Sequence, residues 1–372
     1  MRTYSKVVIN KKALRMAQTG HPWVYGEEVV RIDGPWQTGD LVDVYSEKNK
    51  YVGTGFINDV SKIRVRIVSR NANDTFDDAF WRRRVDYALA YRRTVMGEKD
   101  FSCCRLIFGD ADEMPGLTVD LFSDVLVTQT LCYGMDRIKE RIFKPLVEGL
   151  SIYGIHIRGI YERNDVKVRE LDGLTQYKGW YEAPWLPERP GKPMTTICEN
   201  HILYDVDIEN GQKTGFFLDQ KYNRLAVSRL AAGKHVLDCF THTLNAARGG
   251  AAFVTAVDIS EEAVERTISN IEKNDFSPTV KAVQANVFDL LTQLAEEKNR
   301  DYDFIILDPP AFTKSGHTLK NAYRGYKEIN LKAMKILPRG GYLATCSCSH
   351  FMTDELFRRM LKEAADDAGV SL

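Results

Sequence analysis

Up to about residue 72, short apolar runs alternate with glycine, proline and asparagine breaks, which predicts a small β-rich module. The predicted strands are Lys6–Ile9, Leu41–Tyr45, Tyr51–Ile57 and Lys62–Val68. In the last of them Arg64 and Arg66 alternate with apolar residues, so we expect both to point outward from one sheet face. Such a face suits RNA phosphates, although arginines that only solvate a sheet edge would give the same pattern.

From Asp77 to about Met96 the apolar residues recur at helical spacing, which predicts a connecting helix. Its polar positions carry arginines at 82–84 and 92–93, interleaved with Tyr87 and Tyr91. Basic residues beside aromatic rings are typical of RNA contacts, yet a solvated helix face has the same composition. Both interpretations stay open.

A second α+β unit follows this helix. Its predicted elements are strands at Leu117–Asp120, Val125–Thr130 and Ile157–Tyr161, and a helix at Met135–Leu150. The proline- and glycine-rich segment Ala183–Pro193 then predicts a loop.

From about Tyr204, apolar strand patterns alternate with helical ones, as in a doubly wound α/β sheet with parallel strands. The strands are expected at His235–Phe240, Phe253–Asp258, Val280–Gln284, Phe304–Leu307 and Gly341–Cys346. Ligands of such sheets lie beyond the carboxyl ends of the strands. We therefore expect three domains, at residues 1–73, 74–203 and 204–372, with the ligand site in the third.

Composition limits the partners. The 372 residues carry 51 basic and 51 acidic side chains, so no global field draws the protein to nucleic acid or membranes. Residues 1–70 hold twelve Lys or Arg against seven Asp or Glu, and RNA would have to use such a local patch. The seven cysteines form no CxxC pair, so no metal site is predicted, and free cysteines fit a cytoplasmic protein. No apolar run is long enough to span a bilayer.

The second strand of the third domain ends at Asp258, where a carboxylate can accept hydrogen bonds from both ribose hydroxyls of NAD or S-adenosylmethionine (AdoMet). The structural alternative is a plain helix N-cap formed by Asp258 with Ser260. The turn after the first strand, Asp238–Gly250, has no GxGxxG, so a pyrophosphate lacks its glycine cradle. AdoMet is therefore the expected cofactor, and NAD-linked oxidoreduction is disfavoured.

The fourth strand runs into Asp308-Pro309-Pro310-Ala311-Phe312. The prolines stiffen the turn, so that it can present Asp308 to a planar base while Phe312 offers a stacking face. This pattern is typical of methyltransferases that act on nucleobases, and a purely structural turn is the alternative.

Two cysteines, Cys346 and Cys348, follow the fifth strand. Carbon 5 of a pyrimidine is a poor nucleophile, so its methylation needs a thiolate to attack carbon 6. A cysteine beside Asp308 can supply that thiolate, if the site lowers its pKa.

The chain resembles the RlmI-type bacterial AdoMet-dependent methyltransferases, which form 5-methylcytosine in large-subunit (23S) ribosomal RNA. The resemblance covers essentially the whole length. Its motifs are His21–Val24 and Ile63–Arg66 in a PUA RNA-binding domain, Tyr161–Asp165 in a central α+β domain, and Gly211–Gln220 and Asn223-Arg224 at the entry to the catalytic domain. It implies a class I, Rossmann-like methyltransferase domain behind a PUA domain and a central α+β domain.

Position by position, the resemblance implies AdoMet contacts at Lys213, Phe216, Phe217, Asp219, Gln220, Asp238, Asp258, Ile259, Asn286, Val287 and Asp308. Among these, Asp258 would bind the ribose, Asn286 would lie near the adenine and Asp308 would also hold the cytosine through N3.

The resemblance also implies the groups that meet the RNA. Cys348 would be the nucleophile, because Ser347–Ser349 matches the family's Ser-Cys-Ser. Cys346 is the alternative, since it follows a threonine as the nucleophile does in related RNA cytosine methyltransferases. Substrate contacts are expected at Pro309, Pro310, Phe312, Arg64 and Arg66. The expected partner is large-subunit ribosomal RNA, with a homodimer as an open alternative and no membrane.

Two departures from the family keep other functions open. The turn between Thr243 and Leu244 is about four residues short, and the chain ends at Val370–Leu372, where the family's fold continues with antiparallel strands. We expect the given sequence to be incomplete at both places, whereas a real deletion at the turn would favour a non-catalytic RNA-binding relative. A methyltransferase for an exocyclic amine or another substrate is the remaining alternative, because Asp-Pro-Pro turns serve amines without any cysteine.

Overall fold

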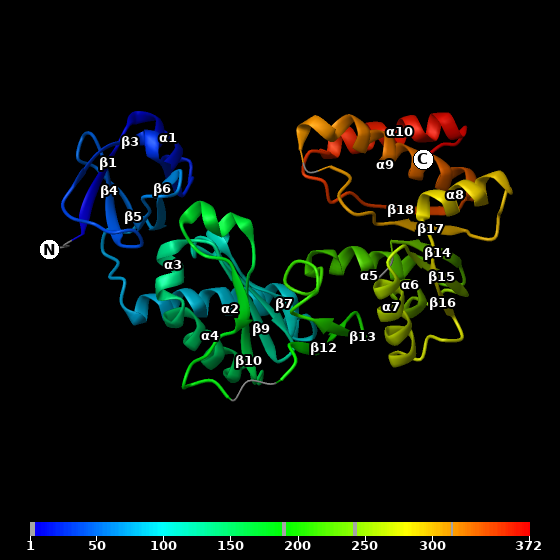
Figure 1. The fold of residues 1–372 in the computed structure, drawn as a ribbon, viewed down its shortest axis with the longest axis horizontal. Helices are drawn as coiled ribbons and strands as arrows, with labels where there is room; N and C mark the ends of the chain where they lie inside the picture. The colour runs from blue at the N-terminus through cyan, green and yellow to red at the C-terminus, as the bar shows by residue number, and fades with distance from the viewer. Residues whose placement is uncertain (1–3, 188–190, 241–243, 314) are drawn as a thin grey trace. The chain divides into compact units, whose positions relative to one another are not determined.

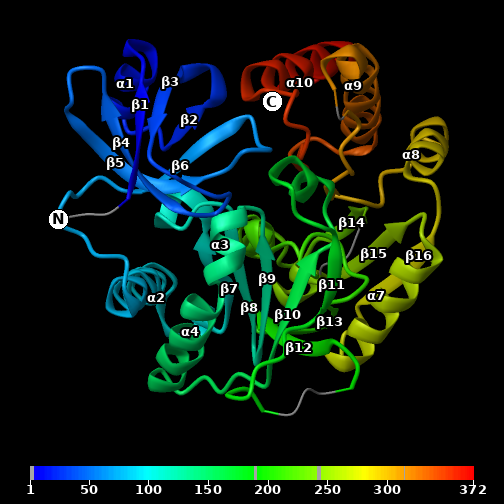
Figure 2. The ribbon, with the colours of Figure 1, turned by 60° about the vertical axis from the view of Figure 1, so that its left-hand side comes forward.

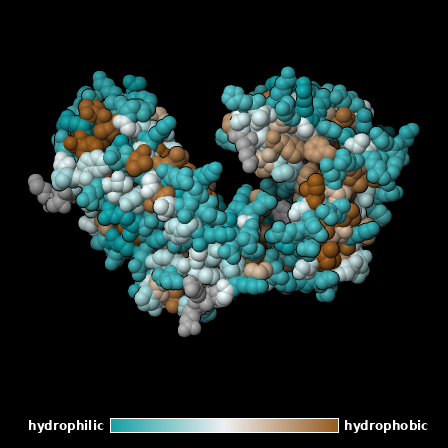
Figure 3. Space-filling model, viewed as in Figure 1, coloured by the Kyte–Doolittle hydropathy of each residue, from teal (hydrophilic) through white to brown (hydrophobic). Residues whose placement is uncertain are grey.

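A computed structural model describes residues 4–187, 191–240, 244–313 and 315–372. The chain divides into two compact units, Met1–Cys198 with Asp205–Leu218 and Glu199–Tyr204 with Asp219–Leu372 (Figure 1). Among the described residues, no helix is long and apolar enough to cross a bilayer. On the face drawn in Figure 3, hydrophilic side chains predominate and apolar ones form separate patches.

The first unit begins with a six-stranded sheet in the order β2-β6-β5-β4-β1-β3. Its strands are β1 (Ser5–Ile9), β2 (Trp23–Tyr25), β3 (Val29–Asp33), β4 (Leu41–Ser46), β5 (Tyr51–Ile57) and β6 (Ile63–Ser69). The four strands predicted for this region are confirmed. Strands β2 and β3 and helix α1 (Lys11–Gln18), which begins at an Asn10 side-chain cap, were not predicted.

Helix α2 (Asp78–Phe101) confirms the predicted connecting helix. The Asp77 side chain caps its first turn by accepting a hydrogen bond from the Phe80 backbone N–H. Gly97 interrupts the helix with a φ of 68°. The ring of Trp81 stacks on Phe56 of β5, with centroids 6.1 Å apart, so α2 shares a core with the N-terminal sheet.

A second, five-stranded sheet of the first unit has the order β11-β10-β9-β8-β7 (Figure 2). Its strands are β7 (Cys103–Phe108), β8 (Leu117–Phe122), β9 (Val125–Thr130), β10 (Gly159–Asn164) and β11 (Tyr177–Trp180). The helices that connect its strands are α3 (Tyr133–Ile138), α4 (Glu140–Ile152), η2 (Gly109–Asp112) and η3 (Lys167–Asp172), whereas η1 (Gly26–Glu28) lies between β2 and β3 of the N-terminal sheet. A separate two-stranded sheet joins β12 (Met194–Glu199) and β13 (Ile202–Asp207). The predicted helix at Met135–Leu150 is two helices, and β7, β11, β12 and β13 were not predicted.

The second unit is built on five parallel strands in the order β16-β15-β14-β17-β18. They are β14 (His235–Cys239), β15 (Phe253–Asp258), β16 (Val280–Gln284), β17 (Phe304–Leu307) and β18 (Tyr342–Thr345). All five predicted strands are confirmed. Buried Leu237, Ile305 and Leu307 form the centre of its core.

The strand order of this sheet reverses between β14 and β17. Its helices are η4 (Leu218–Gln220), α5 (Lys221–Leu230), α6 (Asn245–Arg248), α7 (Glu261–Lys273), α8 (Val287–Glu296), η5 (Gly316–Thr318), α9 (Leu319–Ile336) and α10 (Asp354–Ala368). Right-handed crossovers place α6 and α7 on one face and α8 and α9 on the other, which is the doubly wound arrangement. The switch point between β14 and β17 is where such sheets bind their ligands.

Candidate active site

Several predicted site residues lie at the carboxyl ends of the five parallel strands, along one edge of the second unit's sheet. Asp238 lies at the end of β14, Asp258 ends β15 and Asp308 directly follows β17. Pairing continues past the strands, because the Asp308 backbone N–H donates to the Cys239 carbonyl at 3.5 Å and that of Cys346 donates to the Leu307 carbonyl at 2.8 Å. These groups therefore share the edge at the switch point.

Asp258 is held by the backbone of the turn that follows it. Its Oδ1 accepts a hydrogen bond from the Ser260 backbone N–H at 2.9 Å, while the Ser260 hydroxyl caps α7 by accepting from the Ala263 N–H at 3.3 Å. The cap is thus Ser260 rather than Asp258. Within the described part of the chain, Asp258 Oδ2 has no hydrogen bond, and the neighbouring Ile259 side chain is 64% exposed. A free carboxylate oxygen beside an exposed apolar side chain fits the ribose and adenine of AdoMet.

The next turn along the sheet edge holds Asn286 and Val287. The Asn286 side chain caps α8 by accepting from the Phe288 N–H at 3.0 Å. Val287 is buried in the core, so only its backbone is available to a ligand. The Gln284 side chain donates to the Ile259 carbonyl at 3.2 Å and ties this turn to that of Asp258, a role the sequence did not indicate.

The other implied AdoMet residues lie in two different units. Lys213, Phe216 and Phe217 belong to the first, where the Lys213 ammonium lies 4.5 Å from the centre of the Phe217 ring. Asp219 and Gln220 belong to the second, where Gln220 Oε1 accepts from the Asn223 side chain at 2.8 Å.

Buried polar contacts position the Gly211–Phe217 segment within the first unit. Arg163, from the Tyr161–Asp165 motif, donates to the carbonyls of Ile208 at 2.6 Å and Gly211 at 3.0 Å. The Thr214 hydroxyl donates to Asp120 at 2.6 Å, and Asp120 also pairs with Arg105 through two bonds of 2.7 and 2.9 Å. Sequence reasoning missed Asp120 and Arg105, since their partners are distant in the chain.

The Asp-Pro-Pro turn is anchored through its aromatic residue. Pro309 is buried and Pro310 is exposed. The Phe312 ring lies 4.5 Å from that of Tyr326 and 5.7 Å from that of Phe288, measured between centroids. The half-buried Phe312 therefore ties the turn to α8 and α9.

The two candidate cysteines lie in different environments. Cys348 is exposed, and its thiol donates to the Pro309 carbonyl with a sulfur–oxygen distance of 3.7 Å. The flanking serines fix the turn, because the Ser349 hydroxyl bonds that of Tyr326 at 2.9 Å and the Ser349 N–H donates to Ser347 Oγ at 3.3 Å. Cys348 is thus presented beside the Asp308 turn.

Cys346, by contrast, is half-buried. Burial first, and then the neighbouring Asp308 carboxylate, raise the pKa of Cys346 to about 12. Its thiol therefore stays protonated at neutral pH. Burial likewise raises the pKa of Cys239 far above that of a free thiol.

Arg64 and Arg66 share the strand face opposite buried Val65 and Ile67, as predicted, but carboxylates of the protein engage both. Arg66 is 13% exposed and pairs with Asp172 at 2.8 Å, and Arg64 is 22% exposed and pairs with Asp59 at 2.6 Å. Arg64 also donates to the Asn58 carbonyl at 2.8 Å. Asp172 of the η3 segment, more than a hundred residues later in the chain, thus engages Arg66, which the alternation predicted to face RNA.

Two further expectations concern the turn after β14 and metals. The shortened turn before Leu244 begins in residues 241–243, which lie outside the described residues. Leu244 itself donates its backbone N–H to the Tyr204 hydroxyl at 3.3 Å. Among residues 4–187, 191–240, 244–313 and 315–372, no group of three His, Cys, Asp or Glu side chains could hold a metal ion.

Comparison with protein families gives two matches. Residues 7–70 match a PUA-like domain, and residues 166–370, more than half of the chain, match the S-adenosylmethionine-dependent methyltransferases. Two solved structures share the fold: a SAM-dependent methyltransferase of Streptococcus mutans (22% identity, TM-score 0.73, 97% of this chain and 90% of that one) and a methyltransferase complexed with SAH (22% identity, TM-score 0.75, 96% and 90%).

Curated relatives are more similar in sequence. Ribosomal RNA large subunit methyltransferase I of Pseudoalteromonas translucida is 38% identical over 95% of this chain and 87% of its own length. The protein of that name from Klebsiella pneumoniae is 34% identical over 98% and 90%. With this identity over nearly the whole chain, and with the methyltransferase fold and its site in place, the protein belongs to the ribosomal RNA large subunit methyltransferase I family and is an AdoMet-dependent methyltransferase.

Proposed function

We propose that the protein forms 5-methylcytosine in large-subunit ribosomal RNA, with Cys348 as the nucleophile. The name of its relatives, ribosomal RNA large subunit methyltransferase I, supports large-subunit ribosomal RNA as the substrate. The observation that carries the chemistry is the exposed Cys348 thiol, held against the Pro309 carbonyl in the turn that presents Asp308.

The thiol position suits attack on a base flipped out of the RNA stack. Cys348 loses its proton to water, and its sulfur bonds to carbon 6 as the C5–C6 double bond opens. Asp308, which must carry a proton for this step, donates it to N3, where negative charge develops, and takes it back when the C6–S bond breaks. Carbon 5 takes the methyl group and then loses its own proton to water, and the C6–S bond breaks to release the thiolate.

AdoMet, when bound, supplies the methyl group from its sulfonium. The residues that would hold it follow from the sheet edge: Asp258 through its free oxygen for the ribose, and Ile259 with the Asn286 turn for the adenine. The family resemblance adds Asp219 and Gln220 of the same unit.

The environment of each cysteine supports Cys348 over Cys346. A thiol with a pKa of about 12 has almost no thiolate at pH 7, and the adjacent Asp308 carboxylate opposes its ionisation. Cys348 lies beyond the end of β18 and is exposed, so its sulfur is accessible to a base presented at this edge of the sheet.

The test is methyl transfer from labelled AdoMet to unmodified ribosomal RNA by Cys348→Ser, with Cys346→Ser as the matched control. We expect Cys348→Ser to lose at least about 1,000-fold in rate, because no covalent adduct can form. Cys346→Ser should stay within about fivefold of the wild type. A Cys348→Ser protein that methylated RNA at the wild-type rate would rule out this role.

The product and the adduct can also be seen directly. In RNA carrying 5-fluorocytosine, fluorine replaces the hydrogen at carbon 5 and cannot leave as a proton does. The C6–S bond then cannot break, so a stable protein–RNA adduct should form with the wild type and not with Cys348→Ser. Mass spectrometry of the modified nucleoside separates carbon 5 from the exocyclic amine, the second candidate. Calorimetric titration with AdoMet addresses the non-catalytic alternative, which micromolar binding would contradict.

A further inference from the structure

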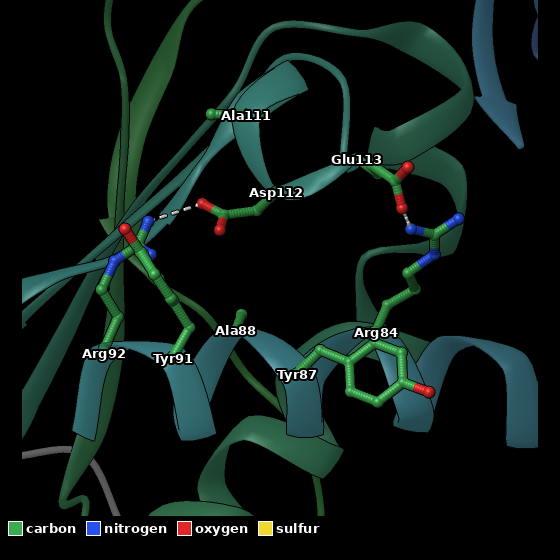
Figure 4. Close-up of a pocket in the computed structure, with 8 residues that line it drawn as sticks. All are labelled: Arg84, Tyr87, Ala88, Tyr91, Arg92, Ala111, Asp112 and Glu113. Atoms are coloured by element: carbon green, nitrogen blue, oxygen red, sulfur yellow. Dashed lines mark hydrogen bonds and ion pairs between the residues drawn. The ribbon is translucent and has the colours of Figure 1, made fainter. Parts of the chain in front are cut away.

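A slot in the first unit lies between α2 and the η2 segment (Figure 4). It has a volume of about 550 Å³ and is built wholly from residues that take no part in the candidate active site. Figure 4 shows α2 on one side, Ala111 to Glu113 on the other, and an arginine–carboxylate pair towards each end.

Two exposed tyrosines form the α2 side of this slot. Tyr87 is 63% exposed and Tyr91 is 58% exposed, and their i, i+4 spacing puts both rings on one helix face. Between them Ala88 is buried, which keeps the floor of the slot shallow. Two large aromatic side chains left in water at helical spacing mark a contact surface rather than a core.

The ends of the slot are fixed by internal ion pairs. Arg92 pairs with Asp112 at 2.7 Å and donates to the Arg105 carbonyl at 2.8 Å. Arg84 pairs with Glu113 and donates to the Val68 carbonyl at 3.1 Å. Both guanidinium side chains are only 12–13% exposed, so neither moves freely towards a ligand. The charges that line the slot therefore balance.

A balanced, rigid slot with aromatic walls suits a neutral planar ring better than a phosphate. The Arg92 guanidinium already lies 4.9 Å from the centre of the Tyr91 ring, which leaves that ring polarised for stacking. The carboxylate of Glu113, whose side chain is 56% exposed, can accept hydrogen bonds from the exocyclic amine of a base. One turn before Tyr87, the side chain of Arg83 is 47% exposed and lies 3.8 Å from Asp74, so it can reach a phosphate beside the stacked base.

We propose that this slot binds unpaired bases of the RNA substrate, which stack on Tyr87 and Tyr91. Aromatic side chains with arginines nearby are how proteins hold single-stranded RNA without reading its sequence. The inference rests on the proposed function, because it takes RNA as the substrate. It adds a second RNA contact to the one made by the reacting cytosine.

The test uses three double variants of the full-length protein: Tyr87→Phe/Tyr91→Phe, Tyr87→Leu/Tyr91→Leu and the matched control Val95→Ala paired with Ile152→Ala, two exposed apolar side chains of the same unit. Phenylalanine keeps the stacking face, whereas leucine keeps apolar area without it. Binding of a fluorescent single-stranded RNA is measured by anisotropy, and stacking by the quenching of a 2-aminopurine within it.

We expect the leucine pair to raise the Kd for single-stranded RNA by about tenfold or more, which is the loss of one stacked base. The 2-aminopurine quenching should disappear with it. The phenylalanine pair and the control should bind within about twofold of the wild type. With ribosomal RNA as substrate, the leucine pair should raise KM and leave kcat unchanged, because the slot contains no reacting group.

A leucine pair that binds and quenches as the wild type does would overturn the proposal, and would point to an apolar protein contact or to none. Melting temperatures of all variants show whether a loss comes from unfolding. If the wild type itself neither bound nor methylated ribosomal RNA, the proposed function would fail instead, so the two failures are distinguishable.

Discussion

The polar side chains of the sequence motifs differ between the two units in whether they are bound internally or exposed to a ligand. In the first unit, Arg66, Arg163 and Asp120 all form hydrogen bonds with other residues of the protein, at donor–acceptor distances of 2.6 to 3.0 Å. At the carboxyl edge of the second unit's sheet, Asp258 keeps a carboxylate oxygen and Cys348 keeps an exposed thiol.

The difference follows from how each group is supported. A charge buried between elements must be paired, because desolvation of a lone ion costs several kcal/mol. Polar groups just beyond a parallel strand are held by short backbone bonds, such as Ser260 N–H to Asp258, and still face the ligand crevice. Buried ion pairs occur in both units, as Arg224–Glu199 of the second unit shows, but the sheet edge of the second unit also exposes the groups that we propose for chemistry.

After Cys348→Ser, the largest effect on activity is expected from Asp308→Asn. Asparagine keeps the shape and cannot share a proton with N3, so we expect kcat to fall by about 100- to 10,000-fold. The matched control is Asp303→Asn, at the opposite edge of the same strands, where Asp303 accepts from the His235 N–H at 3.1 Å. It should keep kcat within about threefold. Equal losses in both variants, measured with labelled AdoMet and ribosomal RNA, would show that sheet stability and not chemistry is affected.

Much of the second unit could be predicted from sequence because its central strands β14 and β17 are buried on both faces. Strands β15, β16 and β17 match their predicted bounds residue for residue. In β17 the reason is plain, because a central parallel strand is a short apolar run between turns. The sheet edge then follows from topology, which is why Asp258 and Asp308 could be predicted as neighbours of one crevice.

The failures have a different physical cause. Alternation in Ile63–Ile67 located the strand, yet it could not show that Asp172, 106 residues later, covers Arg66. Cys346 and Cys348 are two residues apart, and their exposure differs because the Cys346 N–H still pairs with β17 while Cys348 lies beyond that ladder. The buried Asp120 network is likewise set by tertiary contacts that no local pattern contains.

Asp120→Asn should have the largest effect on stability. It weakens the bonds to Arg105 and Thr214 around a fully buried carboxylate, so we expect the free energy of unfolding of the first unit to fall by about 3 kcal/mol. Asp59→Asn removes an exposed partner of Arg64 and should cost less than about 1 kcal/mol. Urea unfolding of both variants tests the difference between buried and exposed pairs, and a loss of equal size would contradict it.

Arg66→Ala should have a moderate effect, and on stability rather than on RNA. It leaves the buried Asp172 carboxylate without its guanidinium, which costs about 1–3 kcal/mol of unfolding free energy. Asp172 keeps its bond from the Tyr133 N–H at 3.1 Å, which limits the loss. RNA affinity, measured by anisotropy below the unfolding transition, should change by less than about twofold. Tenfold weaker RNA binding with unchanged stability would restore Arg66 as an RNA contact.

The smallest effect concerns Cys346 and high pH. Its folded-state pKa of about 12 lies above that of a free thiol, so the folded state disfavours the thiolate. The stability that this contributes is fully present below about pH 8.5, the pKa of an unfolded thiol, and is lost as pH rises through the folded pKa. Over that range the slope cannot exceed about 1.4 kcal/mol per pH unit for one proton. Urea unfolding between pH 8 and 10.5 should therefore show a shallower decline for Cys346→Ser than for the wild type. A Cys346→Ser protein that declined as steeply as the wild type would show that Cys346 does not carry this pH dependence.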